Sequence, residues 1–116
     1  MLRRRRPRSA GKPLEKCAPI FAALGDETRL HLVALLCVGG ALSITQLTAG
    51  TNITRQAITK HLAVLSEAGL VLDVKVGRER LWEFEPAQLD EARRSLEGIA
   101  QQWDQALERL RLVVED

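Results

Sequence analysis

The sequence predicts a mostly helical domain with one small β-hairpin. The composition favours helices: 46% of the 116 residues are hydrophobic but only 3% are aromatic, so we expect a core of Leu, Val, Ile and Ala. Apolar residues recur at helical spacing along most of the chain, whereas residues 71–86 alternate with a period of two. We therefore expect a disordered basic arm (1–13), a helical domain that includes the hairpin (14–86) and a C-terminal helix (87–116).

The net charge of +2 is unevenly distributed. Residues 1–13 hold six basic residues and no acidic residue, and residues 54–80 hold five basic and three acidic residues. Residues 81–116 hold four basic and nine acidic residues. The arm and the middle segment are therefore the parts suited to a polyanion. For the arm, a solvated tail without a specific role is the alternative interpretation.

Two helices are expected at the start of the domain. Pro19 interrupts the apolar spacing of residues 14–25, so the first helix is either kinked there or begins there. Asp26 is placed to cap the N-terminus of the next helix, which Gly39-Gly40 ends. The apolar face of this second helix is expected to consist of Leu30, Val33, Ala34 and Cys37.

A helix-turn-helix motif is expected next. Ser43 and Gln46 have the spacing of a capping box, which predicts a short helix after Ser43. A break at 50–52 follows, and Thr54 is placed to cap a second helix over 54–70. Two short helices joined by a turn of about three to four residues are typical of this motif.

The two faces of the helix over 54–70 differ in chemistry. One face is an apolar stripe formed by Ile58, Leu62 and Leu65. The other face has no acidic residue before Glu67 and consists of Arg55, Gln56, Thr59 and Lys60. Arg and Lys suit guanine, Gln suits adenine, and Thr suits a thymine methyl or a phosphate, so we expect this face to bind double-stranded DNA. Ser43 and Thr54, at the helix N-termini, are also expected at the DNA interface, where the N-terminal amides of the first helix face a phosphate. A merely solvated polar face is the alternative.

The alternating residues 71–86 predict a β-hairpin. Leu72, Val74 and Val76 alternate with polar residues, and the turn is expected at 76–79. A helix-turn-helix followed by a two-stranded hairpin is a winged helix, in which the hairpin forms the wing. Wing contacts to the DNA backbone or the minor groove are expected from Lys75, Arg78 and Arg80.

The last segment carries a heptad pattern of apolar residues, spaced alternately by three and four from Leu89 to Val113. Such a seam is expected to pair with the same helix of a second copy, and packing on its own domain alone is the alternative. A two-fold dimer places two recognition helices in successive major grooves, about 34 Å apart. The expected dimer interface comprises Leu14, Phe21, Leu89, Leu96, Ile99, Trp103 and Leu110.

Several segments resemble the ArsR family of small winged-helix transcriptional repressors. They are LGDETRLHLVALL, LSITQLTAG, TRQAITKHLAVLSEAGLV and VGRERLW, and the resemblance covers about residues 20–86. It implies a homodimer that blocks transcription from a palindromic operator, with an interface built from the first and last helices. The GRERLW wing and a last helix that carries Trp resemble the subset without metal sites, whose members look like autorepressors.

We expect neither a metal nor a cofactor. In arsenic and cadmium sensors of the family a Cys-x-Cys lies in the first helix of the motif, where residues 43–45 are Ser, Ile and Thr. Other relatives bind zinc through Asp and His on the last helix, which has no His in this chain. Cys17 and Cys37 are interpreted as reduced core residues, His61 as a partly buried residue beside the DNA face, and His31 as a surface residue. A metal-responsive repressor with an atypical site is the alternative, and the sequence identifies no small-molecule inducer.

Enzymatic and membrane functions are not expected. The sequence has no Ser-His-Asp candidate, no Gly-rich phosphate loop and no Tyr. Its longest apolar stretch, LVALLCVGGAL, is too short and too interrupted to span a bilayer, and no apolar signal segment follows the early arginines. We expect a cytoplasmic DNA-binding regulator, and the alternative is a winged helix that binds a protein partner.

Overall fold

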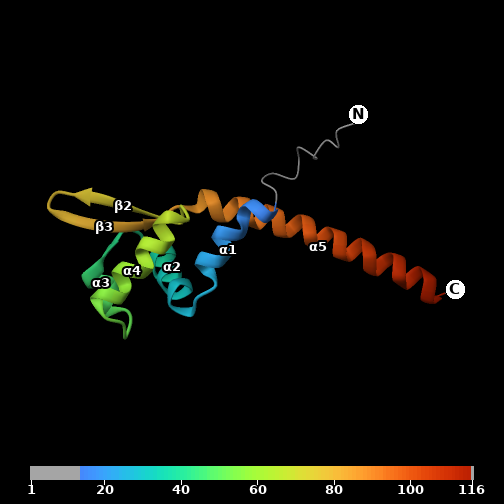
Figure 1. Ribbon diagram of the computed structural model, residues 1–116, viewed down its shortest axis with the longest axis horizontal. Helices are drawn as coiled ribbons and strands as arrows, with labels where there is room; N and C mark the ends of the chain where they lie inside the picture. Colours follow the sequence, from blue (N-terminus) through green and yellow to red (C-terminus); the bar gives the residue numbers. More distant parts are fainter. Residues whose placement is uncertain (1–13, 116) are drawn as a thin grey trace, which may run out of the picture.

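The computed structural model describes residues 14–115, and the predicted arm at 1–13 lies outside the described residues. The domain is helical with a small sheet, as the sequence predicts, and a long helix leaves it on one side (Figure 1). In chain order the elements are η2 (Leu14–Cys17), α1 (Ala18–Leu24), α2 (Glu27–Gly39), β1 (Leu42–Ser43), α3 (Ile44–Ala49), α4 (Arg55–Glu67), β2 (Val71–Val76), β3 (Glu79–Phe84) and α5 (Pro86–Glu115).

The predicted helix N-caps are all formed. The side chain of Asp26 accepts a hydrogen bond of 3.0 Å from the backbone N–H of Arg29, and the side chain of Thr54 caps α4. Ser43 and Gln46 form both halves of a capping box, at 3.2 and 2.9 Å. Each cap satisfies a backbone donor that the helix itself cannot. The connection between α3 and α4, residues 50–54, is longer than the predicted turn.

The core lies where α1, α2, α3 and α4 meet the inner face of the hairpin and the start of α5. The predicted stripe of α4 is confirmed, since Ile58, Leu62 and Leu65 are fully buried. The other buried hydrophobic residues are Cys17, Ile20, Ala23, Leu32, Val33, Leu36, Leu47, Leu70, Val71, Trp82 and Ala92.

The predicted apolar face of α2 is wrong at three of its four residues: Val33 is buried as predicted, whereas Leu30, Ala34 and Cys37 are exposed. The buried residues are Leu32, Val33 and Leu36, whereas Leu30 is 52% exposed and Cys37 is exposed. This helix is apolar on most of its circumference, so periodicity does not select a face, and contacts with α1, α4 and β3 decide which side is buried. Cys17 is a core residue as predicted, and Cys37 is not.

The sheet has three antiparallel strands in the order β1-β3-β2. The sequence missed β1, because two residues are too few to show alternation. The register pairs Val71 with Phe84 on the inner face, whereas Leu72 and Val76 are on the outer face and are 44% and 55% exposed. The apolar residues that predicted the hairpin therefore lie on the face turned away from the core.

Helix α5 begins at Pro86, one residue earlier than predicted, and only its first part packs on the domain. There Ala92 and Ser95 are buried, and the Oγ of Ser95 lies 3.6 Å from the Sγ of Cys17. The remainder projects away from η2 and α1 (Figure 1). No helix within residues 14–115 has both the length and the hydropathy that a bilayer crossing requires.

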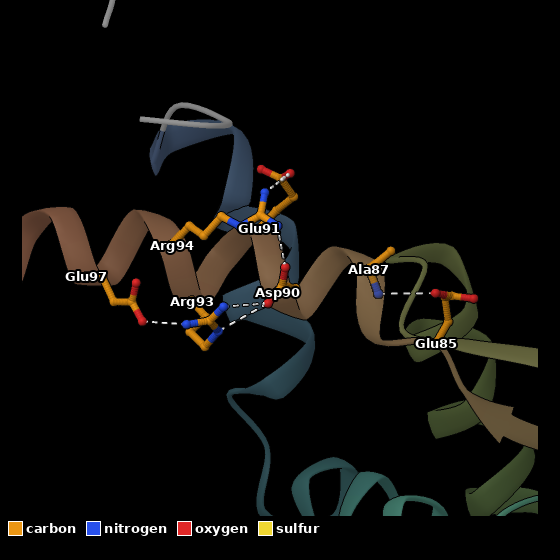
Figure 2. A network of polar contacts seen from close by, with 7 residues as sticks. All are labelled: Glu85, Ala87, Asp90, Glu91, Arg93, Arg94 and Glu97. Atoms are coloured by element: carbon orange, nitrogen blue, oxygen red, sulfur yellow. Dashed lines mark hydrogen bonds and ion pairs between the residues drawn. The ribbon is translucent and has the colours of Figure 1, made fainter. Parts of the chain in front are cut away.

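The charged side chains on the polar side of α5 form ion pairs with one another within the helix (Figure 2). Asp90 pairs with Arg93 and with Arg94, both at 2.8 Å, and Arg93 also reaches Glu97. The hydrogen bond from Arg93 and the two positive charges lower the pKa of Asp90. These pairs lie one helical turn apart, the spacing at which opposite charges support a helix.

Candidate nucleic-acid interface

The exposed face of α4 carries the four residues that the sequence assigned to base recognition. Arg55, Gln56, Thr59 and Lys60 are all exposed, while Ile58 on the opposite side is buried. Helices α3 and α4 and the hairpin occupy the end of the domain opposite the projecting part of α5 (Figure 1). This end therefore presents a helix and a wing together, without the acidic C-terminal segment.

Two of these four side chains have partners in the protein. The Nη1 of Arg55 donates a hydrogen bond of 3.1 Å to the Oγ1 of Thr45 on α3, and the Oγ1 of Thr59 donates to the carbonyl of Arg55 at 2.9 Å. Within residues 14–115, Gln56 and Lys60 form no hydrogen bond or ion pair. Gln56 and Lys60 thus keep all their donors and acceptors for a ligand.

Ser43 and Thr54 are used as helix caps. The oxygen of Ser43 accepts from the backbone N–H of Gln46, and the oxygen of Thr54 accepts from the backbone N–H of Ala57. The sequence placed both residues at the DNA interface. In the structure their side chains each occupy one of the backbone donors that a phosphate would otherwise use.

The three predicted wing cations differ in their surroundings. Lys75 and Arg78 are exposed and form no hydrogen bond or ion pair within residues 14–115. Arg80 instead forms an ion pair with Asp73, with its Nε 2.8 Å from the Oδ2 of the carboxylate. The sequence reading missed Asp73, although alternation places both members of the pair on one face of the hairpin.

A polar joint connects α4 to the first two helices, and sequence reasoning did not find it. The Nε of Arg29 donates to the carbonyl of Ala23 at 2.6 Å, and its Nη1 lies 3.4 Å from the Nδ1 of His61 on α4. The Nδ1 of His61 also lies 3.9 Å from the Oδ2 of Asp26. The hydrogen bond from the backbone N–H of Arg29 is the main cause that lowers the pKa of Asp26; burial opposes it, and the positive charge of Arg29 adds to the lowering.

Comparison with known proteins assigns the chain to a family. A family model described as a helix-turn-helix domain matches residues 24–74. The HTH-type transcriptional regulator YuzN of Bacillus subtilis is 42% identical over 71 residues, which cover 56% of this chain and 77% of that protein. The arsenical resistance operon repressor of Escherichia coli is 42% identical over 59 residues, which cover 51% of this chain and 50% of that protein.

Among solved structures, an ArsR-like transcriptional regulator from Rhodococcus sp. RHA1 matches with a TM-score of 0.75 and 38% identity. The match covers 85% of this chain and 92% of that one. This chain belongs to the ArsR family of transcriptional regulators. The predicted family, the winged helix-turn-helix fold and the DNA-binding regulatory function are thereby confirmed.

The cysteines and histidines of this ArsR-family member are dispersed. Within residues 14–115, no group of three or more His, Cys, Asp or Glu side chains is arranged to hold a metal ion. Cys17 is buried beside α5, and Cys37 lies exposed on α2. His61 is partly buried and His31 is exposed, as the sequence predicts.

The predicted dimer residues of this ArsR-family chain form an apolar surface along η2, α1 and α5. Phe21 and Leu89 pack partly against the core, and the other five are exposed hydrophobic residues: Leu14, Leu96, Ile99, Trp103 and Leu110. Two apolar grooves lie between α1 and α5, on either side of Leu96. Exposed apolar surface of this extent is typical of a protein–protein interface.

Proposed function

We propose that this ArsR-family member is a homodimeric repressor that binds a palindromic operator and acts at the promoter of its own operon. The observation that carries the proposal is the exposed face of α4, which has no acidic residue before Glu67 and on which Gln56 and Lys60 have no partner within the described residues. The name of the Escherichia coli relative, an arsenical resistance operon repressor, supports repression as the outcome of binding.

The four residues of the α4 face suit contacts to different bases. Lys60 and Arg55 suit the O6 and N7 acceptors of guanine, and Gln56 suits the N6 and N7 of adenine. The hydrogen bond of Arg55 to Thr45 uses its Nη1, so its Nη2 stays available for a base or a phosphate. The hydroxyl of Thr59 is engaged with the backbone of α4, which favours its methyl group for contact with a thymine methyl.

The wing contributes sequence-independent affinity. Within residues 14–115, Lys75 and Arg78 have no acidic partner; they lie near the wing tip and suit the phosphate backbone beside the groove that α4 enters. Each phosphate neutralised by such a cation releases counterions, so the binding constant falls as salt rises. Binding by this protein should therefore depend on ionic strength as well as on sequence.

The dimer is proposed from the exposed seam of α5. Trp103 and Leu110 are 63% and 59% exposed, and no element within residues 14–115 covers them. The same helix of a second copy, with α1, supplies a surface of matching chemistry, as a two-fold interface requires. Two linked copies then read two half-sites, and the linkage raises affinity above that of a single half-site.

Fluorescence anisotropy of the full chain tests this function, with its own upstream DNA and a scrambled duplex titrated over a salt series. We expect the upstream DNA to bind at least about a thousandfold more tightly. Equal, steeply salt-dependent binding to both duplexes would contradict sequence-specific recognition at this promoter. Absence of binding to either duplex at moderate salt would instead support a winged helix that recognises a protein.

A further inference from the structure

The wing contains a carboxylate among its cations. Asp73 lies on β2 and receives two hydrogen bonds from Arg80 on β3, from Nε at 2.8 Å and from Nη2 at 2.5 Å. The register places Asp73 opposite Trp82 and Lys75 opposite Arg80, so these side chains share the inner face of the hairpin. The part of this face that does not pack on the core carries a small hollow. The hollow is lined by Asp73, Lys75, Arg78 and Arg80.

Arg80 is held from a second side by an aromatic ring. The centre of its guanidinium lies 5.3 Å from the ring centroid of Trp82, which is only 7% exposed and belongs to the core. A cation over an aromatic face is attracted by the ring quadrupole. Arg80 therefore lies between a carboxylate that balances its charge and a ring that is itself fixed.

The three wing cations therefore differ in how available their charge is to a DNA phosphate. Lys75 and Arg78 have no acidic partner within the described residues, whereas the charge of Arg80 is compensated by Asp73. A phosphate that bound Arg80 would have to displace Asp73 or lie close to its negative charge. Counting basic residues in the sequence overestimates the number of cations that the wing offers.

We propose that Asp73 is a positioning residue that keeps Arg80 off the DNA phosphates and so limits the sequence-independent affinity of the wing. The inference rests on the proposed DNA-binding function and deepens it. In this arrangement Lys75 and Arg78 release counterions on binding, and the pair of Asp73 with Arg80 contributes no net charge to the complex. The pair instead links the two strands of the wing on the face that also carries Trp82.

The test compares the salt dependence of binding for charge variants on one duplex. Asp73→Asn keeps the shape of the side chain and frees Arg80, so we expect tighter binding and a log–log salt slope steeper by about 0.9. The charge-balanced double variant Asp73→Asn with Arg80→Gln should bind like the wild type, in affinity and in slope. Arg78→Gln is the matched control for a free cation, and its slope should be shallower by about 0.9.

Two results would overturn the inference. One is a double variant whose slope becomes shallower to the same degree as that of Arg78→Gln, because Arg80 would then contact a phosphate in the wild type. The other is weaker binding by Asp73→Asn, because Asp73 would then orient Arg80 toward the DNA. Both side chains of the pair are largely exposed, at 46% and 66%, so the variants should stay folded, and circular dichroism checks this.

The failure of this inference is distinguishable from the failure of the proposed function. The salt slopes concern phosphate contacts and can be measured on a scrambled duplex as well as on upstream DNA. A wild-type protein that does not discriminate the two duplexes contradicts the proposed operator recognition, whatever the variants do. A discriminating wild type with unchanged slope in Asp73→Asn contradicts only the role assigned to Asp73.

Discussion

The Nη1 of Arg29 lies 3.4 Å from the Nδ1 of His61, which connects α2 to α4. The same guanidinium donates to the carbonyls of Ala22 and Ala23 at the end of α1. Three helices thus meet at one side chain, and α1 is also part of the proposed dimer surface. This joint therefore connects α4 to a helix that carries part of the proposed dimer surface.

Asp26, in the same joint, should make stability depend on pH. Its pKa is lower in the folded protein than its ordinary value of 3.8, chiefly because it accepts the backbone N–H of Arg29. A lowered folded pKa means that the stabilisation is present above the ordinary value and is lost as pH falls through the folded pKa. Asn is an equally good N-cap without the charge. The stability difference between wild type and Asp26→Asn should therefore be constant well above pH 3.8 and should shrink in urea titrations as the pH is lowered below that value. A difference that stays constant at low pH would contradict this.

Removing a core side chain from the inner face of α4 should destabilise the domain strongly. Leu62 is fully buried, so Leu62→Ala leaves a cavity and should cost about 2–5 kcal/mol. Val64 lies on the same helix and is 39% exposed, so Val64→Ala should cost less than about 1 kcal/mol. Urea unfolding of both variants at one protein concentration measures the difference, and similar losses would argue against the burial of Leu62.

Two glycines should respond to Ala in opposite directions. Gly98 lies within α5 with nothing within 4 Å of an added Cβ, so Gly98→Ala should stabilise the protein by about 0.5–1 kcal/mol. Gly69 has a φ of +78° and would place its Cβ 3.0 Å from the Cγ of Gln88, so Gly69→Ala should destabilise it. Thermal unfolding followed by circular dichroism measures whether each substitution raises or lowers stability. A stabilising Gly69→Ala would contradict the left-handed turn.

Charges placed in the α5 seam should separate the proposed dimer. We expect Leu96→Glu and Trp103→Glu to be monomeric in sedimentation velocity, because a buried, unpaired carboxylate is costly in an apolar interface. Gln101→Glu is the matched control, since it adds the same charge to an exposed position outside the seam. A Trp103→Glu variant that stays dimeric would mean that this part of α5 is not the main interface.

Substitutions in α4 and in the wing should affect DNA binding differently. Gln56→Ala removes a side chain without a partner in the described residues, so it should reduce discrimination at one base pair by about 1–3 kcal/mol. Arg78→Ala should weaken binding to operator and scrambled duplex by similar factors. Anisotropy titrations with single-base operator variants separate the two effects. Uniform loss in Gln56→Ala would place that residue on the backbone instead of a base.

The local features of the fold were predictable from the sequence, because they depend on residues close in the chain. The caps at Asp26, Ser43 and Thr54 each need only a side chain and a backbone donor three residues later. The buried stripe of α4 follows from one clear helical period. The buried face of α2 was not predictable in this way, because apolar residues surround the helix. Contacts with neighbouring elements determine that Leu32 is buried and Leu30 is exposed.

The candidate site was predictable in its residue types but not in its contacts. The polar face of α4 and the basic wing tip follow from sequence spacing alone. The pairing of Asp73 with Arg80 depends on the register of the hairpin, and the contact of Arg29 with His61 joins residues on different helices. Both contacts require the folded arrangement and cannot be read from residue spacing alone.

The two tryptophans give this protein a pair of separate optical reporters. Trp82 is 7% exposed in the core of the domain, whereas Trp103 is 63% exposed on the projecting part of α5. The sequence has no Tyr, so these two indoles account for the near-ultraviolet emission. Unfolding should shift the emission of Trp82 to longer wavelength, and covering of α5 should shift that of Trp103 to shorter wavelength. Single Trp→Phe variants then allow folding and assembly to be followed independently without an added dye.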